Sequence, residues 1–135
     1  DVERSRGLGD VYKRQRQIDD LTISPKPPSS GMKQDLERLN HVIAQCDVSQ
    51  INLKVVVFDD ADYEFAKMIH HRYPHLPFYL QVGNPYLEDH VEHHTQKLLE
   101  HYEQLIDRVT EDAEMNEVYV LPQLHTLVWS NKKGV

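Results

Sequence analysis

Residues 53–82 read LKVVVFDDADYEFAKMIHHRYPHLPFYLQV and combine two strand-like runs with one helical period. The runs Leu53–Phe58 and Phe78–Val82 are nearly continuous in apolar residues, which is typical of strands that are buried on both faces. Between them, Ala61–Tyr73 places its apolar residues on one stripe, at steps of three and four. A strand, a helix and a second strand with short connections predict a parallel βαβ unit.

The same alternation extends outward on both sides of this unit. Leu21–Ser24 and Val118–Leu121 are further strand-like runs, and Met32–Cys46 and Leu87–Thr110 carry further helical stripes. The sequence therefore predicts an α/β fold with mainly parallel strands. Such folds bind ligands at the carboxyl ends of their strands, so we expect the functional residues there.

Each predicted helix has a recognisable start signal. Ser30 or Gly31 precedes the first helix, Asp59–Asp60 the second, and Pro85 the third. The acidic run that begins at Asp59 lacks the glycine and the distal glutamate of a calcium loop, and helix capping explains it.

Composition limits the classes of function. The chain has 135 residues, a net charge of −7 and one cysteine. This length fits one domain, which can bury a core without disulfide or metal cross-links. The acidic balance disfavours a nucleic-acid surface, no apolar run approaches the roughly 20 residues of a membrane helix, and a single thiol suits a reducing compartment. We therefore expect a cytoplasmic protein with no nucleic-acid or membrane partner.

Residues 1–16 differ from the rest of the chain. They show no sustained apolar period, and the string GLGDVYKRQ at 7–15 resembles a translated library-adapter sequence. We expect a disordered leader here, and a fold that comprises residues 17–135. The sequence does not begin with Met, so we also expect a truncated reading frame.

The most informative strand end is the loop SPKPPSSGM, residues 24–32. Its three prolines restrict the backbone φ angle and remove three N–H donors, so the loop is stiff. The loop holds the hydroxyl of Ser24 and the ammonium of Lys26, on either side of Pro25, at the carboxyl end of a strand. These groups suit an anionic or ribose-bearing ligand. Composition alone favours the alternative that the loop is a proline-rich connector between a strand and a helix.

A second strand end carries Gln81, Val82, Gly83 and Asn84. Gly83 permits a close backbone approach or a positive φ, and the amides of Gln81 and Asn84 offer donors and acceptors. A turn followed by an Asn–Pro helix start explains the same residues equally well.

Histidines suggest a different class of site. His90, His94 and His101 lie on nearly one face of the predicted third helix, as zinc ligands would, but the HExxH pattern is missing. The alternative hypothesis is therefore a non-catalytic metal-binding or interaction module. His125, just beyond the last strand, orients a ligand or donates to a carbonyl, and chemistry alone favours the second role. Cys46 lies on an apolar stripe and is interpreted as an inert core residue.

Four segments together resemble the 7-carboxy-7-deazaguanine synthase family of radical S-adenosylmethionine enzymes. They are DLTISPKPPSSGM (20–32), LKVVVFDD (53–60), FYLQVGN (78–84) and LPQLHTLVW (121–129), which occur in the family's order. The resemblance covers residues 17–135. It implies part of an incomplete, modified (β/α) TIM-like barrel.

The family converts 6-carboxy-5,6,7,8-tetrahydropterin to 7-carboxy-7-deazaguanine, with loss of ammonia, in queuosine biosynthesis. The resemblance implies a 4Fe–4S cluster, S-adenosylmethionine and Mg²⁺ as cofactors, and a homodimer for the full-length enzyme. It further implies that Ser24, Pro25 and Lys26 bind S-adenosylmethionine and that Gln81–Asn84 line the same pocket. Val135, at the carboxyl terminus, and His125 are the implied substrate contacts.

The family's CxxxCxxC motif, its Mg²⁺-binding Thr and its early substrate-binding strands precede the SPK segment, and they have no counterpart here. The chain therefore resembles the carboxyl-terminal half of the enzyme. We expect no turnover by this chain alone, because one cysteine cannot hold a cluster that takes three or four thiolates. A further hypothesis is an autonomous α/β ligand-binding domain that uses the mouth formed by Ser24–Lys26.

Overall fold

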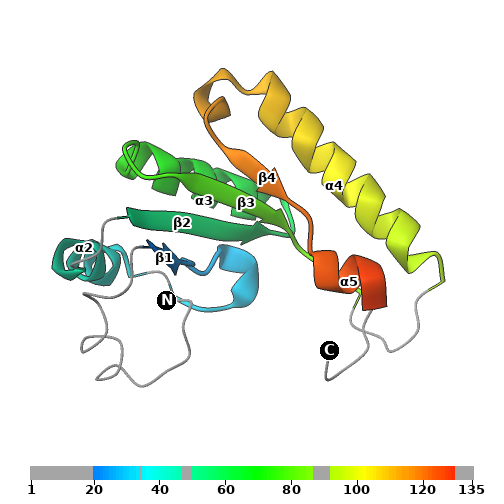
Figure 1. The fold of residues 1–135 in the computed structure, drawn as a ribbon, viewed down its shortest axis with the longest axis horizontal. Coiled ribbons are helices and arrows are strands. Elements are labelled where there is room, and N and C mark those ends of the chain that lie inside the picture. The colour runs from blue at the N-terminus through cyan, green and yellow to red at the C-terminus, as the bar shows by residue number, and fades with distance from the viewer. Residues whose placement is uncertain (1–19, 34, 47–49, 87–91, 130–135) are drawn as a thin grey trace.

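A computed structural model describes residues 20–33, 35–46, 50–86 and 92–129. Its centre is a parallel sheet with the strand order β1-β2-β3-β4 (Figure 1). The strands are β1 (Asp20–Ile23), β2 (Gln50–Val57), β3 (Phe78–Val82) and β4 (Tyr119–Leu121). The predicted α/β class with parallel strands is confirmed, whereas the predicted leader at 1–16 lies outside the described residues.

Helices connect successive strands, and a last helix follows β4. They are α2 (Leu36–Gln45), α3 (Asp60–Arg72), α4 (His94–Glu111) and α5 (Leu124–Trp129), with short 3₁₀ helices η2 (Pro28–Ser30) and η3 (Ala113–Met115). None of the helices in the described part of the chain is long and apolar enough to cross a membrane.

The register of the sheet aligns the core side chains in rows. Leu53 of β2 lies opposite Phe78 of β3, and Val55 lies opposite Leu80. All four are at most 1% exposed, and partners in register point to the same face of a sheet. One apolar cluster joins this face to the helices, through side chains that include Leu39 of α2, Ile69 of α3 and Leu105 of α4.

The side chains that alternate with the core point to the opposite face, which we call the second face. On it, Lys54 lies opposite Tyr79, and Val56 lies opposite Gln81. All four are half-buried. Tyr79 also stacks on Tyr119 of β4, with ring centroids 5.0 Å apart. The second face thus mixes a cation, an amide and aromatic rings, a composition closer to that of a ligand-facing surface than to that of a core.

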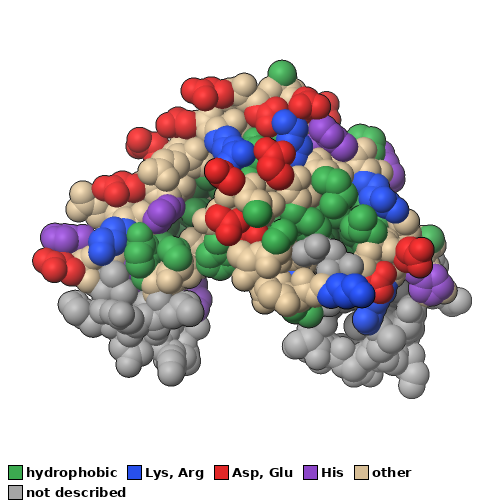
Figure 2. Space-filling model, turned by 180° about the vertical axis from the view of Figure 1, so that it is seen from behind, with side chains coloured by type: hydrophobic (Ala, Val, Ile, Leu, Met, Phe, Trp, Pro, Cys, Tyr) green, Lys and Arg blue, Asp and Glu red, His purple; other side chains and the backbone are tan. Residues whose placement is uncertain are grey.

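Charged side chains connect α3 to α4 and η3. Lys67 Nζ lies 2.9 Å from Asp112 Oδ2 and 2.9 Å from Glu114 Oε2. The Tyr63 hydroxyl donates to Asp112 Oδ2 at 3.0 Å, and the Arg108 guanidinium lies 3.9 Å from the centre of the Tyr63 ring. Figure 2 shows Lys and Arg side chains interspersed with Asp and Glu on the face drawn there.

The first helix begins later than predicted. α2 starts at Leu36, because Asp35 is its N-cap and accepts a backbone N–H at 3.0 Å. Ser30 belongs instead to η2, which Gly31 ends in the left-handed conformation, with φ of 74°. Met32, the first residue of the predicted helix, is 51% exposed.

The third helix also begins later than predicted, at His94. Glu92 and His93 form a turn, and His93 has a φ of 55°, which does not continue a helix. Residues 87–91, where the prediction started the helix, lie outside the described residues. α5 was not predicted, because its 6 residues are too few to show a helical period.

Candidate functional site

Residues 24–28, the SPKPP corner, directly follow β1 and are braced by local hydrogen bonds. Ser24 is 6% exposed, Pro25 is buried and Lys26 is half-buried. The backbone N–H and the hydroxyl of Ser30 both donate to the carbonyl oxygen of Pro27, at 3.0 and 2.7 Å. The proline rings and these bonds leave the corner little conformational freedom.

One buried carboxylate holds the corner against α3. Asp62 is 0% exposed. Its Oδ1 accepts a hydrogen bond from the backbone N–H of Ser29 at 2.9 Å. Its Oδ2 accepts from the hydroxyl of Ser29 at 2.5 Å and from the backbone N–H of Phe58 at 2.9 Å. Asp62 therefore connects the loop after β1 to the end of β2.

This role of Asp62 was missed because the whole acidic run was interpreted as helix capping. Asp59 does cap α3, as predicted, and accepts the N–H of Asp62 at 2.9 Å. Asp62 differs because it precedes Phe65 and Ile69 by three and seven positions and so shares their apolar stripe. An acid on the buried stripe of a helix is the signal that could have identified it.

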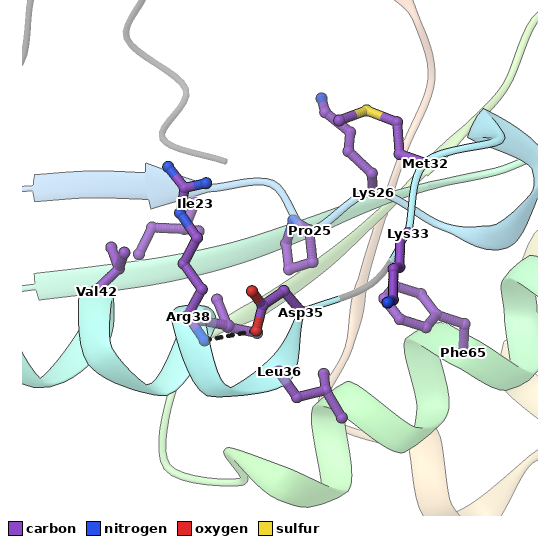
Figure 3. A pocket seen from close by; sticks show the side chains of 11 residues that line it. Ile23, Pro25, Lys26, Met32, Lys33, Asp35, Leu36, Arg38, Val42 and Phe65 are labelled. Carbon is purple, nitrogen blue, oxygen red and sulfur yellow. Dashed lines mark hydrogen bonds between the residues drawn. The ribbon is translucent and has the colours of Figure 1, made fainter.

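A cavity of about 180 Å³ lies between the corner and the first turn of α2 (Figure 3). Lys26, Lys33 and Arg38 line it, together with one acid, Asp35. Apolar groups, Pro25 among them, complete the lining. The excess of cations favours an anionic ligand, and the apolar lining suits a ligand with a hydrophobic part.

This cavity does not include both predicted segments. Pro25 and Lys26 line it, whereas Ser24 and Gln81–Asn84 do not. Gly83 lines another cavity, of about 150 Å³, between the ends of β2 and β3. The first segment follows β1 and the second spans the end of β3, so both lie at the same edge of the parallel sheet, with β2 between them. Their contact with one shared cofactor stays a prediction.

The ring of Phe58 packs closely on Gly83. A Cβ atom there would lie 2.6 Å from ring atoms of Phe58, closer than carbon atoms approach without a shift. The Phe58 side chain is 46% exposed. The backbone N–H of Gly83 donates to the carbonyl oxygen of Val57 at 2.9 Å and so extends the sheet pairing by one residue. The close approach predicted at Gly83 is therefore made by a side chain of this chain.

Gln81 and Asn84 form hydrogen bonds within the chain. Gln81 Nε2 donates to the carbonyl oxygen of Pro122 at 3.5 Å. Asn84 Oδ1 accepts the N–H of Tyr86 at 3.0 Å and lies 3.1 Å from His94 Nε2. The bond to Tyr86 is that of an Asx turn, so Asn84 shapes the chain as it leaves β3.

Two of the three histidines of the alternative metal-binding hypothesis have hydrogen-bond partners within the chain. His94 is 5% exposed, and burial, followed by the charge of Lys97, lowers its pKa. His101 Nε2 lies 2.9 Å from the hydroxyl oxygen of Tyr86. His90 lies outside the described residues. Within the described ranges, no three His, Cys, Asp or Glu side chains are grouped as metal ligands.

Three further residues were singled out in the sequence: His125, Val135 and Cys46. His125 is exposed on α5, with its ring 6.2 Å from that of Trp129. Val135 lies outside the described residues. Cys46 ends α2, packs against the apolar core and has its thiol pKa raised by burial, consistent with the predicted inert role.

Comparison with curated proteins tests the resemblance. The chain is 54% identical to a 7-carboxy-7-deazaguanine synthase of Bacillus cereus over 122 residues, which cover 88% of this chain and 50% of that protein. It is 52% identical to a 7-carboxy-7-deazaguanine synthase of Bacillus subtilis over 126 residues, which cover 87% of this chain and 51% of that protein. This chain is similar to a 7-carboxy-7-deazaguanine synthase.

The resemblance predicted from the four segments is thus confirmed, and the relatives are named for an enzyme. The chain spans about half the length of the 7-carboxy-7-deazaguanine synthases that it matches. No protein-family model matches the sequence.

Proposed function

We propose that this chain is the carboxyl-terminal part of a radical S-adenosylmethionine lyase. The full enzyme would convert 6-carboxy-5,6,7,8-tetrahydropterin to 7-carboxy-7-deazaguanine in queuosine biosynthesis, as a cytoplasmic homodimer. The observation that carries the proposal is the identity of 54% to a 7-carboxy-7-deazaguanine synthase along 88% of the chain. The parallel sheet, with the SPKPP corner at its carboxyl edge, supports it as part of a (β/α) barrel.

This chain's share of the chemistry is to bind and orient S-adenosylmethionine. The ammonium of Lys26 would pair with the carboxylate of the ligand, and the hydroxyl of Ser24 would hydrogen-bond to it. Pro25 keeps these two residues at a constant separation, so little freedom is lost on binding. Gln81 and Asn84 would approach the ligand from the end of β3, where the Phe58 ring already packs on Gly83. When bound and reduced, the cofactors supply the radical that starts the rearrangement.

The residues of this chain do not fit the iron–sulfur cluster. Such a cluster takes three or four thiolates, and the chain has one cysteine. Cys46 is also a poor ligand, because burial raises the pKa of its thiol. We propose that the ligands of the cluster and of Mg²⁺ lie in the half of the enzyme to which this chain has no match, and that the chain alone has no activity.

A half-exchange chimera tests this function. Residues 17–135 would replace the matching segment of the 7-carboxy-7-deazaguanine synthase of Bacillus subtilis, and the product would be measured after anaerobic reconstitution. We expect 7-carboxy-7-deazaguanine to form from 6-carboxy-5,6,7,8-tetrahydropterin. A chimera that folds and holds its cluster but forms no product would overturn the proposal.

A pair of substitutions in the chimera tests the role of the corner. Lys26→Met removes a charge-assisted hydrogen bond, so we expect the Michaelis constant for S-adenosylmethionine to rise about tenfold or more. The control is Arg72→Met, which removes an exposed cation at the end of α3. Equal effects of the two substitutions would contradict the assignment of Lys26.

A further inference from the structure

We propose that Asp62 is a positioning residue that sets the geometry of both predicted cofactor-binding segments. The inference rests on the proposed function, because that function gives the two segments a ligand to hold. Asp62 itself would not touch the ligand, since it is 0% exposed beneath the loop.

The first connection runs from Asp62 to the SPKPP corner. Ser29 donates two hydrogen bonds to the carboxylate, one from its backbone N–H and one from its hydroxyl. Pro27 and Pro28 separate Ser29 from Lys26, and both have a restricted φ angle. Because this spacer is stiff, the position of Ser29 determines where the backbone of Lys26 lies.

The second connection runs from Asp62 to the end of β3 through Phe58. The backbone N–H of Phe58 donates to Asp62 Oδ2 at 2.9 Å. The ring of Phe58 covers Gly83 so closely that a Cβ atom there would lie 2.6 Å from it. The bond to Asp62 therefore constrains the residue whose ring sets the surroundings of Gly83.

At position 62, the carboxylate of aspartate fits the surrounding donors better than the amide of asparagine would. Three uncharged donors converge on two oxygens, and two of the donors are backbone N–H groups that cannot turn away. An asparagine has one acceptor oxygen, so either orientation of its amide would leave a backbone N–H facing an NH₂ group. Leaving a buried donor unpaired is costly, so Asp62→Asn should release one of the two connections.

The first test measures amide hydrogen exchange by NMR in the 135-residue chain. In Asp62→Asn we expect the amide of Ser29 or of Phe58 to exchange at least about tenfold faster, with the middle of α3 unchanged. The matched control is Asp59→Ala, which removes the N-cap of the same helix and should speed exchange only in its first turn. If Asp62→Asn does not fold, Ser29→Ala removes one of the bonds and should speed exchange at residue 29.

The second test measures binding of S-adenosylmethionine to the chimera, at a temperature where circular dichroism shows every variant folded. Asp62→Asn should raise the dissociation constant about tenfold, and Asp59→Ala should leave it within about twofold. Asp62→Glu keeps the charge with a longer side chain and should recover part of the affinity.

The outcomes separate this inference from the proposed function. If the unsubstituted chimera does not bind S-adenosylmethionine, the proposed function fails, while hydrogen exchange still decides whether Asp62 holds the two segments. Unchanged exchange at both amides in Asp62→Asn would overturn the positioning role. Equal losses of affinity in Asp62→Asn and Asp59→Ala would also overturn it, because a general weakening of α3 would then explain both.

Discussion

Single residues at the carboxyl edge of the sheet carry constraints that reach beyond their own element. The Phe58 ring leaves little room for a side chain at residue 83, and the Asp62 carboxylate pairs two backbone N–H groups from different segments. Both constraints act through close packing, in which small changes of volume or of acceptor number are costly.

Gly83→Ala tests the contact with Phe58. The added methyl group would overlap the ring, so we expect the free energy of unfolding to fall by about 1–3 kcal/mol, measured by urea denaturation. Phe58→Ala removes the ring, and Gly83→Ala should then cost less in that background. The same cost in both backgrounds would show that the ring is not the cause.

We expect the buried His70 to make the stability of the fold depend on pH. It is 7% exposed, its ring packs on Phe78, and its Nδ1 has no hydrogen-bond partner among the described residues. Burial, followed by the charge of His71, lowers its pKa from 6.5, against an opposing effect of Glu117. The folded state therefore binds fewer protons than the unfolded state, and stability should fall as the pH drops below about 6.5.

The melting temperature at about pH 7.5 and about pH 5.5 measures this effect. His70→Phe should reduce the difference between the two values, whereas His75→Phe, at an exposed position, should not. His94 has a lowered pKa as well, so part of the difference should persist in His70→Phe. An unchanged difference in His70→Phe would contradict the prediction.

At the scale of elements, hydrogen bonds from Tyr63 and Lys67 to Asp112 join α3 to the segment after α4. The hydrogen bond from Lys67, followed by that from the Tyr63 hydroxyl, lowers the pKa of Asp112 below its ordinary 3.8, against the opposing effect of burial. Burial and the same carboxylate raise the pKa of Tyr63 to about 12. The Tyr63 hydroxyl therefore stays protonated at neutral pH and continues to donate.

Asp112→Asn should weaken these contacts with Tyr63 and Lys67, and the resulting loss of stability should depend on pH. Because the pKa of Asp112 is lower in the folded state, its contribution is complete well above pH 3.8 and is lost as the pH falls through the folded value. We expect the variant to melt below the parent chain at neutral pH and close to it under strong acid. Glu111→Gln, on the neighbouring exposed acid, serves as the control. A difference that persists unchanged in acid would show that the charge is not responsible.

The elements that local sequence predicted best are those with sharp local boundaries. β3 spans Phe78–Val82 as predicted, because Pro77 and Gly83 border a nearly continuous apolar run. β2 begins earlier than predicted, at Gln50, because its polar start is paired with β1. That pairing depends on a distant strand, which the local pattern of residues does not encode.

In the candidate site, too, the features with local sequence signals were predicted and those that depend on distant contacts were not. The SPKPP corner and the segment Gln81–Asn84 were identified because proline, glycine and amide residues at strand ends are local signals. The hydrogen bonds of Asp62 to Ser29 join residues 33 positions apart. The side chains of the second face become neighbours only through the register of the strands. Neither is visible until the strands are placed side by side.

At the scale of the whole molecule, the cysteine count leads to a prediction about metal content. Anaerobic incubation of the 135-residue chain with iron and sulfide should yield no stoichiometric cluster, because one thiol cannot replace the three or four that a cluster takes. Iron analysis and the visible absorption spectrum measure the result, and the half-exchange chimera is the positive control. A stable four-iron cluster on the chain alone would contradict the prediction.

The strand order β1-β2-β3-β4 repeats the order of the chain, and each strand pairs with the one made just before it. During synthesis, every new strand–helix unit can dock onto a neighbour that has already left the ribosome, without waiting for a distant partner. A nascent chain with this topology can therefore gain structure stepwise, one unit at a time.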